Sequence, residues 1–182
     1  MDGIAGGVEK QRVVGVGGEL QEIGRQPFLV ARPLGFGHRV GDRGTLHAVD
    51  PVPVAMPAEV ADRCRNLAEI AGWTRRLHDE AHALAREGGI PVFLGGDHSI
   101  SMGTVSGVAR ACAEAGRELA LIWLDAHSDY NTPATTPSGN LHGMALSFLA
   151  GDPSLAPILG RRLDAVPPAD IHVFGAGVGV LG

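Results

Sequence analysis

Two carboxylates and an imidazole alternate within one short stretch of this sequence. Asp125, His127 and Asp129 are each two residues apart, and side chains two apart in an extended segment point to the same side. Carboxylates that share one space repel each other, so such a group is costly without a cation. A divalent metal ion removes that cost, and His98, after an earlier apolar run, could supply a fourth ligand. Taken alone, this pattern is also compatible with a solvated turn.

Two short apolar runs must position these side chains. Residues 90–94 lead through two glycines to His98, and residues 119–124 lead directly to Asp125. Near-continuous apolarity is typical of strands that are buried on both faces. A predicted helix over residues 102–115 separates the runs, so a parallel pair with a right-handed crossover is the default. His98 and Asp125 would then share the carboxyl edge of the sheet, where open α/β folds place their sites.

The clearest helical pattern covers residues 58–87, where apolar side chains recur at helical spacing between a proline and a pair of glycines. His78 and His82 lie four residues apart on this helix, a spacing that can bind zinc. Because no glutamate or third ligand accompanies them, we expect a solvated or half-buried pair instead.

Further apolar segments complete an α/β pattern. Residues 12–18 indicate a first strand that ends in glycines, and residues 171–175 indicate a last strand. We find no internal repeat and no second domain. We therefore predict one α/β domain over residues 1–182, with three α/β/α layers and a mostly parallel sheet.

Composition excludes several classes of protein. The 182 residues carry a net charge of −5 and only 4% aromatic side chains, which argues against nucleic-acid binding. No segment is long and apolar enough for a membrane span, and residues 1–12 lack the apolar region of a signal peptide. Cys64 and Cys112 have no motif spacing, so we expect reduced core cysteines in a cytoplasmic protein.

Three ordered motifs in this sequence resemble the ureohydrolase family. They are Gly-Gly-Asp-His-Ser at residues 95–99, Asp-Ala-His-Ser-Asp at 125–129 and Ser-Gly-Asn-Leu-His-Gly at 138–143. The Asn-Thr-Pro segment at 131–133 resembles the arginase branch in particular. Agmatinases share the metal motifs but usually lack this loop.

The resemblance implies a hydrolase with two Mn²⁺ ions that cleaves L-arginine to L-ornithine and urea. The family's metal ligands fall on His98, Asp125, His127 and Asp129. Asp125 would bridge the ions, with His98 and Asp129 on one and His127 on the other. The ions would share a bridging hydroxide that attacks the guanidinium carbon. Ligands without thiolates are consistent with manganese rather than zinc.

The resemblance also assigns substrate and proton-transfer roles. His142 would be a catalytic proton shuttle near the mouth of the site, because an imidazole exchanges protons at neutral pH. Asn131, Thr136 and Ser138 would hold the amino-acid end of the substrate, with Asn140 nearby. Neutral donors of this kind suit a carboxylate.

Simpler roles remain open for several of these residues. His142 could be an ordinary loop histidine, and Thr136 and Ser138 could be turn residues that bond their own backbone. Asp97 lies next to a predicted ligand, and we interpret it as a supporting residue beside the metal rather than a ligand.

The family pattern also contains a later motif, Asp-x-Asp-x-x-Asp-Pro, which completes the metal site. This motif does not occur among the 182 residues, and residues 19–35 and 176–182 depart from the family pattern. We therefore expect that the sequence represents the N-terminal part of an arginase-like chain, truncated at its C-terminus.

Three functions remain under consideration. The first is arginase chemistry, with L-arginine as the substrate, no nucleic-acid or membrane partner, and a homo-oligomer as the state of an intact chain. The second is another ureohydrolase such as an agmatinase. The third is a non-catalytic remnant of an arginase that binds metal weakly.

Overall fold

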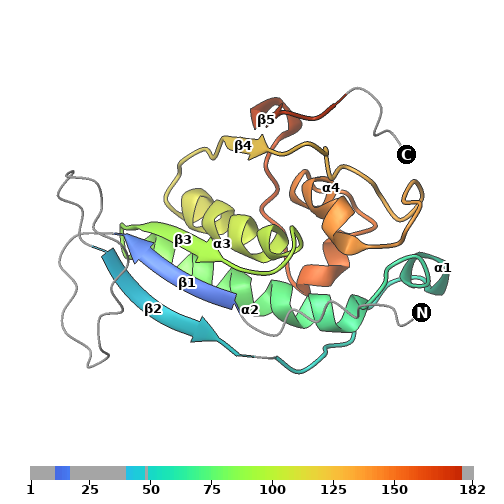
Figure 1. The fold of residues 1–182 in the computed structure, drawn as a ribbon, viewed down its shortest axis with the longest axis horizontal. Coiled ribbons are helices and arrows are strands. Elements are labelled where there is room, and N and C mark those ends of the chain that lie inside the picture. The colour runs from blue at the N-terminus through green and yellow to red at the C-terminus, as the bar shows by residue number, and fades with distance from the viewer. Residues whose placement is uncertain (1–10, 17–39, 48, 178–182) are drawn as a thin grey trace.

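The computed structural model describes residues 11–16, 40–47 and 49–177 (Figure 1). Its strands are β1 Gln11–Val16, β2 Val40–Leu46, β3 Ile90–Leu94, β4 Leu121–Leu124 and β5 Ile171–Phe174. Its α-helices are α1 Ala58–Ala61, α2 Leu67–Arg86, α3 Ile100–Glu114 and α4 Ala145–Leu149. Short 3-10 helices span Leu141–Met144, Ala156–Leu159 and Pro168–Asp170. The predictions for residues 19–35, and for most of the tail 176–182, fall outside the described residues.

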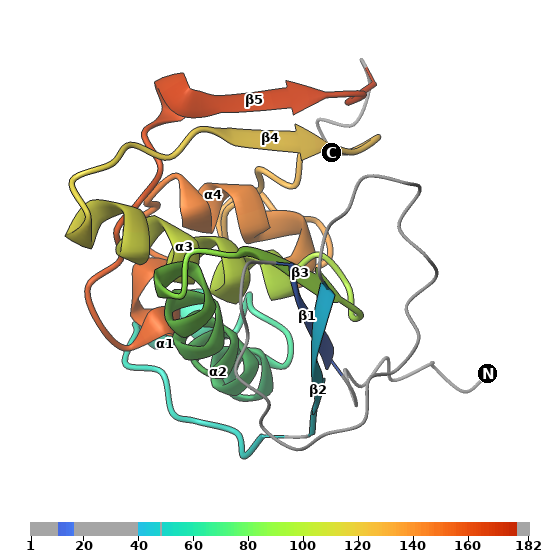
Figure 2. The ribbon, with the colours of Figure 1, turned by 90° about the vertical axis from the view of Figure 1, so that its left-hand side faces the viewer.

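The described strands form two separate sheets. One has the order β2-β1-β3, and the other pairs β4 with β5. Figure 2 shows β4 and β5 lying apart from the three-stranded sheet, with α3 and α4 close to them. The α/β class that the sequence predicts is therefore confirmed.

The predicted strand pairing is wrong in two respects. We expected β3 and β4 to be parallel neighbours in a mostly parallel sheet, but β3 pairs with β1, and β1 runs antiparallel to both of its partners. Parallel pairing is found, within the described residues, between β4 and β5. An apolar run shows that a strand will be buried on some face, but it carries little information about which strand lies beside it. The partner is decided by where the connections return.

Close packing of α2 on α3 forms the centre of the helical layer. Gly103 and Gly107 on α3 face α2, and a Cβ atom at Gly107 would lie 2.3 Å from the carbonyl oxygen of His78. The absence of side chains at these two glycines lets the helix backbones approach closely. His82 adds a hydrogen bond across the same interface, since its Nε2 lies 2.8 Å from Glu114 Oε2.

The predicted helix over residues 58–87 is interrupted. It is observed as α1 and α2, with Asn66 between them in the left-handed region at φ 53°. Asparagine tolerates this conformation better than most residues. The apolar spacing continues across the break because Cys64 is still buried in the core, so periodicity alone did not reveal it.

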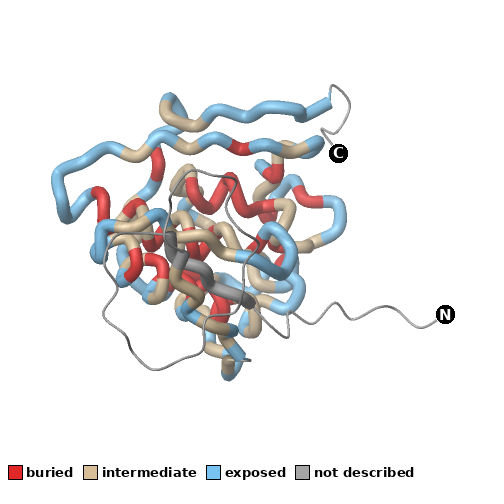
Figure 3. The backbone as a smooth tube through the Cα atoms, turned by 60° about the vertical axis from the view of Figure 1, so that its left-hand side comes forward, coloured by how far each residue is buried: buried red, intermediate tan, exposed pale blue. Residues whose placement is uncertain are grey.

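The hydrophobic core lies between the helices and the inner face of β4. Trp123 of β4 is buried, whereas Ile122 and Leu124 on the other face are 62% and 77% exposed. Figure 3 shows β4 and β5 as a largely exposed layer over a buried helical centre. The apolar runs of β3 and β4 predicted burial on both faces, and this is wrong for the outer faces because no described element covers them. The largest fully buried side chains are Phe148, Leu77, Met102, Leu141, Met144, Leu146, Leu149, Leu155, Ile158, Leu159 and His78.

Two further expectations from the sequence concern the cysteines and membrane-spanning helices. Cys64 and Cys112 are buried free cysteines, as expected. Within the described ranges, no helix combines the length and the apolar character that crossing a bilayer requires. The prediction of a single domain over residues 1–182 stays a prediction.

Candidate functional site

Three of the four predicted ligands lie together. His98, Asp125 and Asp129 each present a ligand atom, and these atoms all lie within 4.8 Å of one another. His98 Nδ1 is 2.8 Å from Asp125 Oδ2 and 2.6 Å from Asp129 Oδ2. Both carboxylates are largely buried, with side chains 12% and 8% exposed. The two largely buried acids therefore share one nitrogen of an imidazole that is itself 54% exposed.

His98 reaches the group from the loop between β3 and α3. Gly95 and Gly96 both have positive φ, 125° and 63°, which lets the chain turn directly after the strand. Asp97 Oδ1 accepts hydrogen bonds from the backbone N–H and the hydroxyl of Ser99, which shapes the turn that leads into α3. These contacts place His98 on a short, internally bonded loop.

Asp125 and Asp129 are positioned by β4 and by the segment that follows it. The backbone N–H of Asp125 donates to the carbonyl of Phe174, which extends the β4–β5 pairing by one bond. Asp129 has a left-handed backbone at φ 47°, and its carbonyl accepts from the N–H of Leu146 on α4. The side chain of Asp129 is thereby turned back toward Asp125.

The imidazole and the two carboxylates perturb one another. The hydrogen bond that His98 donates to Asp129 raises the pKa of His98 above its ordinary value, and the nearby negative charges act in the same direction against desolvation. His98 Nδ1 can donate one hydrogen at most, so it can satisfy only one of the two carboxylates beside it. Asp125 Oδ2 is buried and accepts no hydrogen bond within the described structure. A buried carboxylate oxygen that lies beside the imidazole but receives no hydrogen bond costs free energy unless a cation or proton approaches it.

This donor set fits a divalent metal ion. Two carboxylates and one imidazole offer oxygen and nitrogen ligands without thiolate, the chemistry that Mn²⁺ and similar ions accept. The unsatisfied Asp125 Oδ2 faces the same point as the other ligand atoms. Two largely buried carboxylates that converge on one imidazole leave excess negative charge, which a cation would neutralise. The roles of these residues as ligands stay predictions.

Trp123, which belongs to none of the sequence motifs, supports this group. The indole ring of Trp123 meets the His98 ring edge-on, with ring centroids 5.9 Å apart. Edge-to-face contacts of this kind restrict ring orientation. The available signal was a bulky residue two positions before Asp125, because side chains two apart along an extended segment share a face.

His127 and His142 lie outside the three-residue group. His127 is 60% exposed, and its Nδ1 lies 3.7 Å from Asp125 Oδ1. His142 Nδ1 lies 3.5 Å from Asp97 Oδ2, and both side chains are more than two fifths exposed. His142 is therefore near the group and open to solvent, beside the acid that precedes His98.

The predicted substrate residues lie on an ordered loop between Asp129 and α4. Thr136 is buried and its hydroxyl accepts from the N–H of Gly139, while the Ser138 hydroxyl accepts from the N–H of Asn140. These are the turn contacts that the sequence left open as a simpler role. Asn131 Oδ1 accepts from the hydroxyl of Thr135. The predicted contacts of these residues with a substrate stay predictions.

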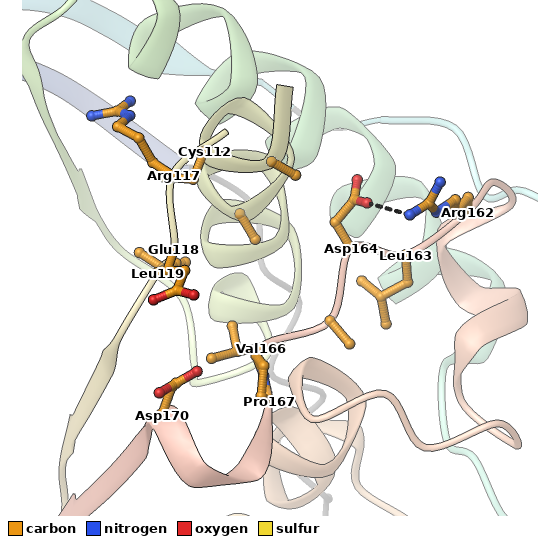
Figure 4. Close-up of a pocket in the computed structure, with 13 residues that line it drawn as sticks. Cys112, Arg117, Glu118, Leu119, Arg162, Leu163, Asp164, Val166, Pro167 and Asp170 are labelled. Carbon is orange, nitrogen blue, oxygen red and sulfur yellow. Dashed lines mark ion pairs between the residues drawn. The ribbon is translucent and has the colours of Figure 1, made fainter. Parts of the chain in front are cut away.

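A cavity of about 280 Å³ lies elsewhere, between the end of α3 and the segment before β5. Figure 4 shows Arg117, Glu118 and Asp170 at its edge, and Arg162 paired with Asp164 at 3.4 Å. None of the predicted ligands or substrate residues lines it. It adjoins the amino-terminal end of β4, whereas Asp125 follows the carboxyl end, so the cavity is not part of the candidate metal site.

The chain is similar to known proteins in both sequence and structure. The family model described as "Arginase family" matches residues 32–172. An arginase of Agrobacterium fabrum is 48% identical over 106 residues, which cover 54% of this chain and 33% of that protein. An arginase structure from Bacillus caldovelox has a TM-score of 0.57 at 34% identity, over 71% of this chain and 42% of that chain. One from Bacillus cereus has a TM-score of 0.56 at 37% identity, over 64% and 39%.

The matched region is a minor part of each of these proteins. The chain spans 33% of the length of the curated relative from Agrobacterium fabrum and 32% of one from Neurospora crassa. The similarity therefore concerns the part of the fold that carries the candidate metal group, and the activity of the whole relative is not established for this chain by it.

Proposed function

Because this chain belongs to the arginase family, we propose that it provides the metal site for hydrolysis of the guanidinium group of L-arginine to L-ornithine and urea. The observation that carries the proposal is the convergence of His98, Asp125 and Asp129 around an unsatisfied buried carboxylate oxygen. The proposal concerns the site, since the chain covers only part of its relatives.

His98, Asp125 and Asp129 would hold manganese in this proposal, with the exposed His127 available beside Asp125. A bound ion of this kind supplies hydroxide at neutral pH by lowering the pKa of a coordinated water. The chain's own contribution is orientation. The hydrogen bond between His98 and Asp129, and the contact of His98 with Trp123, hold the imidazole in place before any ion binds.

His142 is suited to move a proton between the site and solvent. Its ring is partly exposed, and the carboxylate of Asp97 lies within 3.5 Å of Nδ1. In general an imidazole can take up and release a proton near neutral pH. Departure of an amine from the guanidinium carbon requires one proton, and in this proposal His142 would provide it.

The loop at 131–140 would recognise the amino-acid end of the substrate. Asn131 and Ser138 are partly or fully accessible and offer neutral polar groups that suit an α-carboxylate. Thr136 is buried and bonded within its turn, so we assign it to shaping the loop. Agmatine lacks the carboxylate, so these residues favour L-arginine as the substrate.

A non-catalytic role is the second candidate, and one observation favours it. Within the described residues, a single group of three side chains converges as a metal site. Two manganese ions require more ligands than this group and His127 provide. A chain with one weak metal site would bind an ion without efficient turnover.

The test is urea release by the purified, manganese-loaded chain from L-arginine and from agmatine. We expect slow release that is faster from L-arginine, and Asn131→Ala should reduce the use of L-arginine more than that of agmatine. Equal or faster release from agmatine would favour the agmatinase alternative. Metal binding without urea from either compound would favour the non-catalytic candidate.

A further inference from the structure

We propose that Arg63, in the turn between α1 and α2, is a positioning residue that holds the 131–140 loop in the shape that recognises a substrate carboxylate. The inference rests on the proposed function, because it assigns the carboxylate contact to the same loop. Arg63 is far from the metal motifs in sequence and belongs to none of the motifs described above.

The contact is made by one guanidinium and two backbone carbonyls. Arg63 Nε donates to the carbonyl oxygen of Pro133, and Nη2 donates to that of Thr136 at 3.0 Å. A guanidinium presents its donors in a rigid planar fork, so two simultaneous bonds fix an angle as well as a distance. The two carbonyls are three residues apart, so Arg63 spans one complete turn of the loop.

A second contact from the same turn holds the other end of the loop. The backbone N–H of Arg65 donates to the carbonyl of Gly139 at 2.8 Å. Gly139 has φ 77°, and a Cβ atom at this position would lie 3.1 Å from the carbonyl oxygen of Arg63. The loop backbone is therefore pressed against residues 63–65 at a position that suits glycine.

Arg63 itself stands on a fixed base. Its N–H donates to the carbonyl of Val60, and the next residue, Cys64, is buried in the hydrophobic core. Asn66 closes the turn in its left-handed conformation before α2 begins. The break in the predicted helix is thus the feature that aims the guanidinium at the loop.

The remaining bonds of the loop are mostly local and neutral. Thr132 N–H donates to the hydroxyl of Thr135, and the Thr136 hydroxyl accepts from Gly139 N–H. Local turn bonds of this kind define each turn but do not fix the turns against the rest of the protein. The charged bonds from Arg63, together with the backbone bond from Arg65, supply that link. In sequence, Asn131 and Ser138 lie on either side of the two carbonyls that Arg63 holds.

The experiment compares Arg63→Ala with Arg63→Lys and with Arg76→Ala. Arg76 is a matched control, because it pairs with Glu80 within α2 rather than with the loop. Amide hydrogen exchange, measured residue by residue, reports the order of the loop. Calorimetric titration of the manganese-loaded chain with L-ornithine and with putrescine reports recognition of the carboxylate, since putrescine lacks it.

We expect Arg63→Ala to speed exchange at the amides of Thr136 and Gly139 by about tenfold or more, with α2 unchanged. The same substitution should weaken the binding of L-ornithine by about tenfold and leave the binding of putrescine nearly unchanged. Arg63→Lys should fall between Arg63→Ala and the unmutated chain, because an ammonium cannot span both carbonyls. Arg76→Ala should match the unmutated chain in both measurements.

Unchanged loop exchange in Arg63→Ala would overturn the inference while leaving the proposed function intact. Equal weakening of L-ornithine and putrescine would also overturn it, since the effect would then not concern the carboxylate. If the unmutated chain bound neither compound, the proposed function would fail together with the carboxylate role. Loop exchange would then still show whether Arg63 orders the loop.

Discussion

Acidification should destabilise this protein through His78, a histidine that is completely buried between α2 and α3. The Ser106 hydroxyl donates to the carbonyl of Gly103, so it accepts a hydrogen bond from Nδ1–H of His78, 2.9 Å away. The other ring nitrogen, Nε2, is buried without a partner in the described structure. Protonation would place a charge and an unsatisfied N–H at that point.

The environment opposes that charge. Burial lowers the pKa of His78 from 6.5 to about 4, and the charges of Arg161, Arg110 and His82 act in the same direction against the smaller opposite effect of Asp79. The neutral ring is therefore the folded form throughout the physiological range.

The size and direction of the effect follow from linkage. Between pH 6.5 and about 4 the unfolded chain binds a proton at this position and the folded chain does not, so stability rises with pH in this window. At about 1.4 kcal/mol per pKa unit, the full loss on acidification is about 3 kcal/mol, of which about 2 kcal/mol is lost by about pH 5. That is a large part of the stability of a small domain.

The assay is denaturant unfolding followed by circular dichroism at about pH 7.5 and about pH 5. His78→Phe keeps an aromatic ring and removes the titrating group, so it should lose about 2 kcal/mol of this pH dependence whatever its stability at neutral pH. His47→Gln, at an exposed histidine, should leave the pH dependence unchanged. An unaltered pH dependence in His78→Phe would refute the reasoning.

Two further predictions concern packing. Gly107→Ala should lower the free energy of unfolding by about 1–3 kcal/mol in denaturant titrations, because its Cβ would lie 2.3 Å from the His78 carbonyl oxygen. Gly143→Ala should leave the free energy of unfolding unchanged, because the space around this position is open. Equal effects of the two substitutions would contradict close packing of the helices. Leu77→Ala should lower the free energy of unfolding by about 2–5 kcal/mol, because this side chain is only 1% exposed. Leu124→Ala should change it by less than about 0.5 kcal/mol, because this side chain is 77% exposed. A similar loss at both positions would show that the outer face of β4 is covered in solution.

The secondary structure could be predicted where one local pattern dominates. The strands at 90–94 and 121–124 and the helix α3 follow from apolar runs and glycine stops, and each is found at or near the expected bounds. Strand partners could not be predicted, because β3 pairs with β1 rather than β4 through contacts between distant residues. The break before α2 was missed since it depends on contacts of Arg63 and Arg65 with a loop about 70 residues away.

The proximity of His98 to Asp125 was expected for a reason that the structure does not support. We expected neighbouring parallel strands, whereas β3 and β4 lie in different sheets. The β3–α3 loop and the left-handed turn at Asp129 bring the side chains together instead. Charge chemistry thus predicted the grouping better than strand topology did.

The complete burial of His78 was not predicted from the sequence. Its spacing from His82 suggested a solvated or half-buried pair, but His78 is completely buried and His82 pairs with Glu114. Only the partner helix reveals this, because Gly103 and Gly107 bring α3 close enough to enclose the ring.

The most direct test of the central claim is manganese binding by the unmutated chain and by Asp125→Asn, measured as the loss of free Mn²⁺ signal in electron paramagnetic resonance. We expect the unmutated chain to hold fewer than two ions, because the described residues offer one converging group. Asp125→Asn should bind at least about tenfold more weakly, since it removes the charge of the unsatisfied carboxylate. Equal binding by the two proteins, or no binding by the unmutated chain, would contradict the assignment of His98, Asp125 and Asp129 as a metal site.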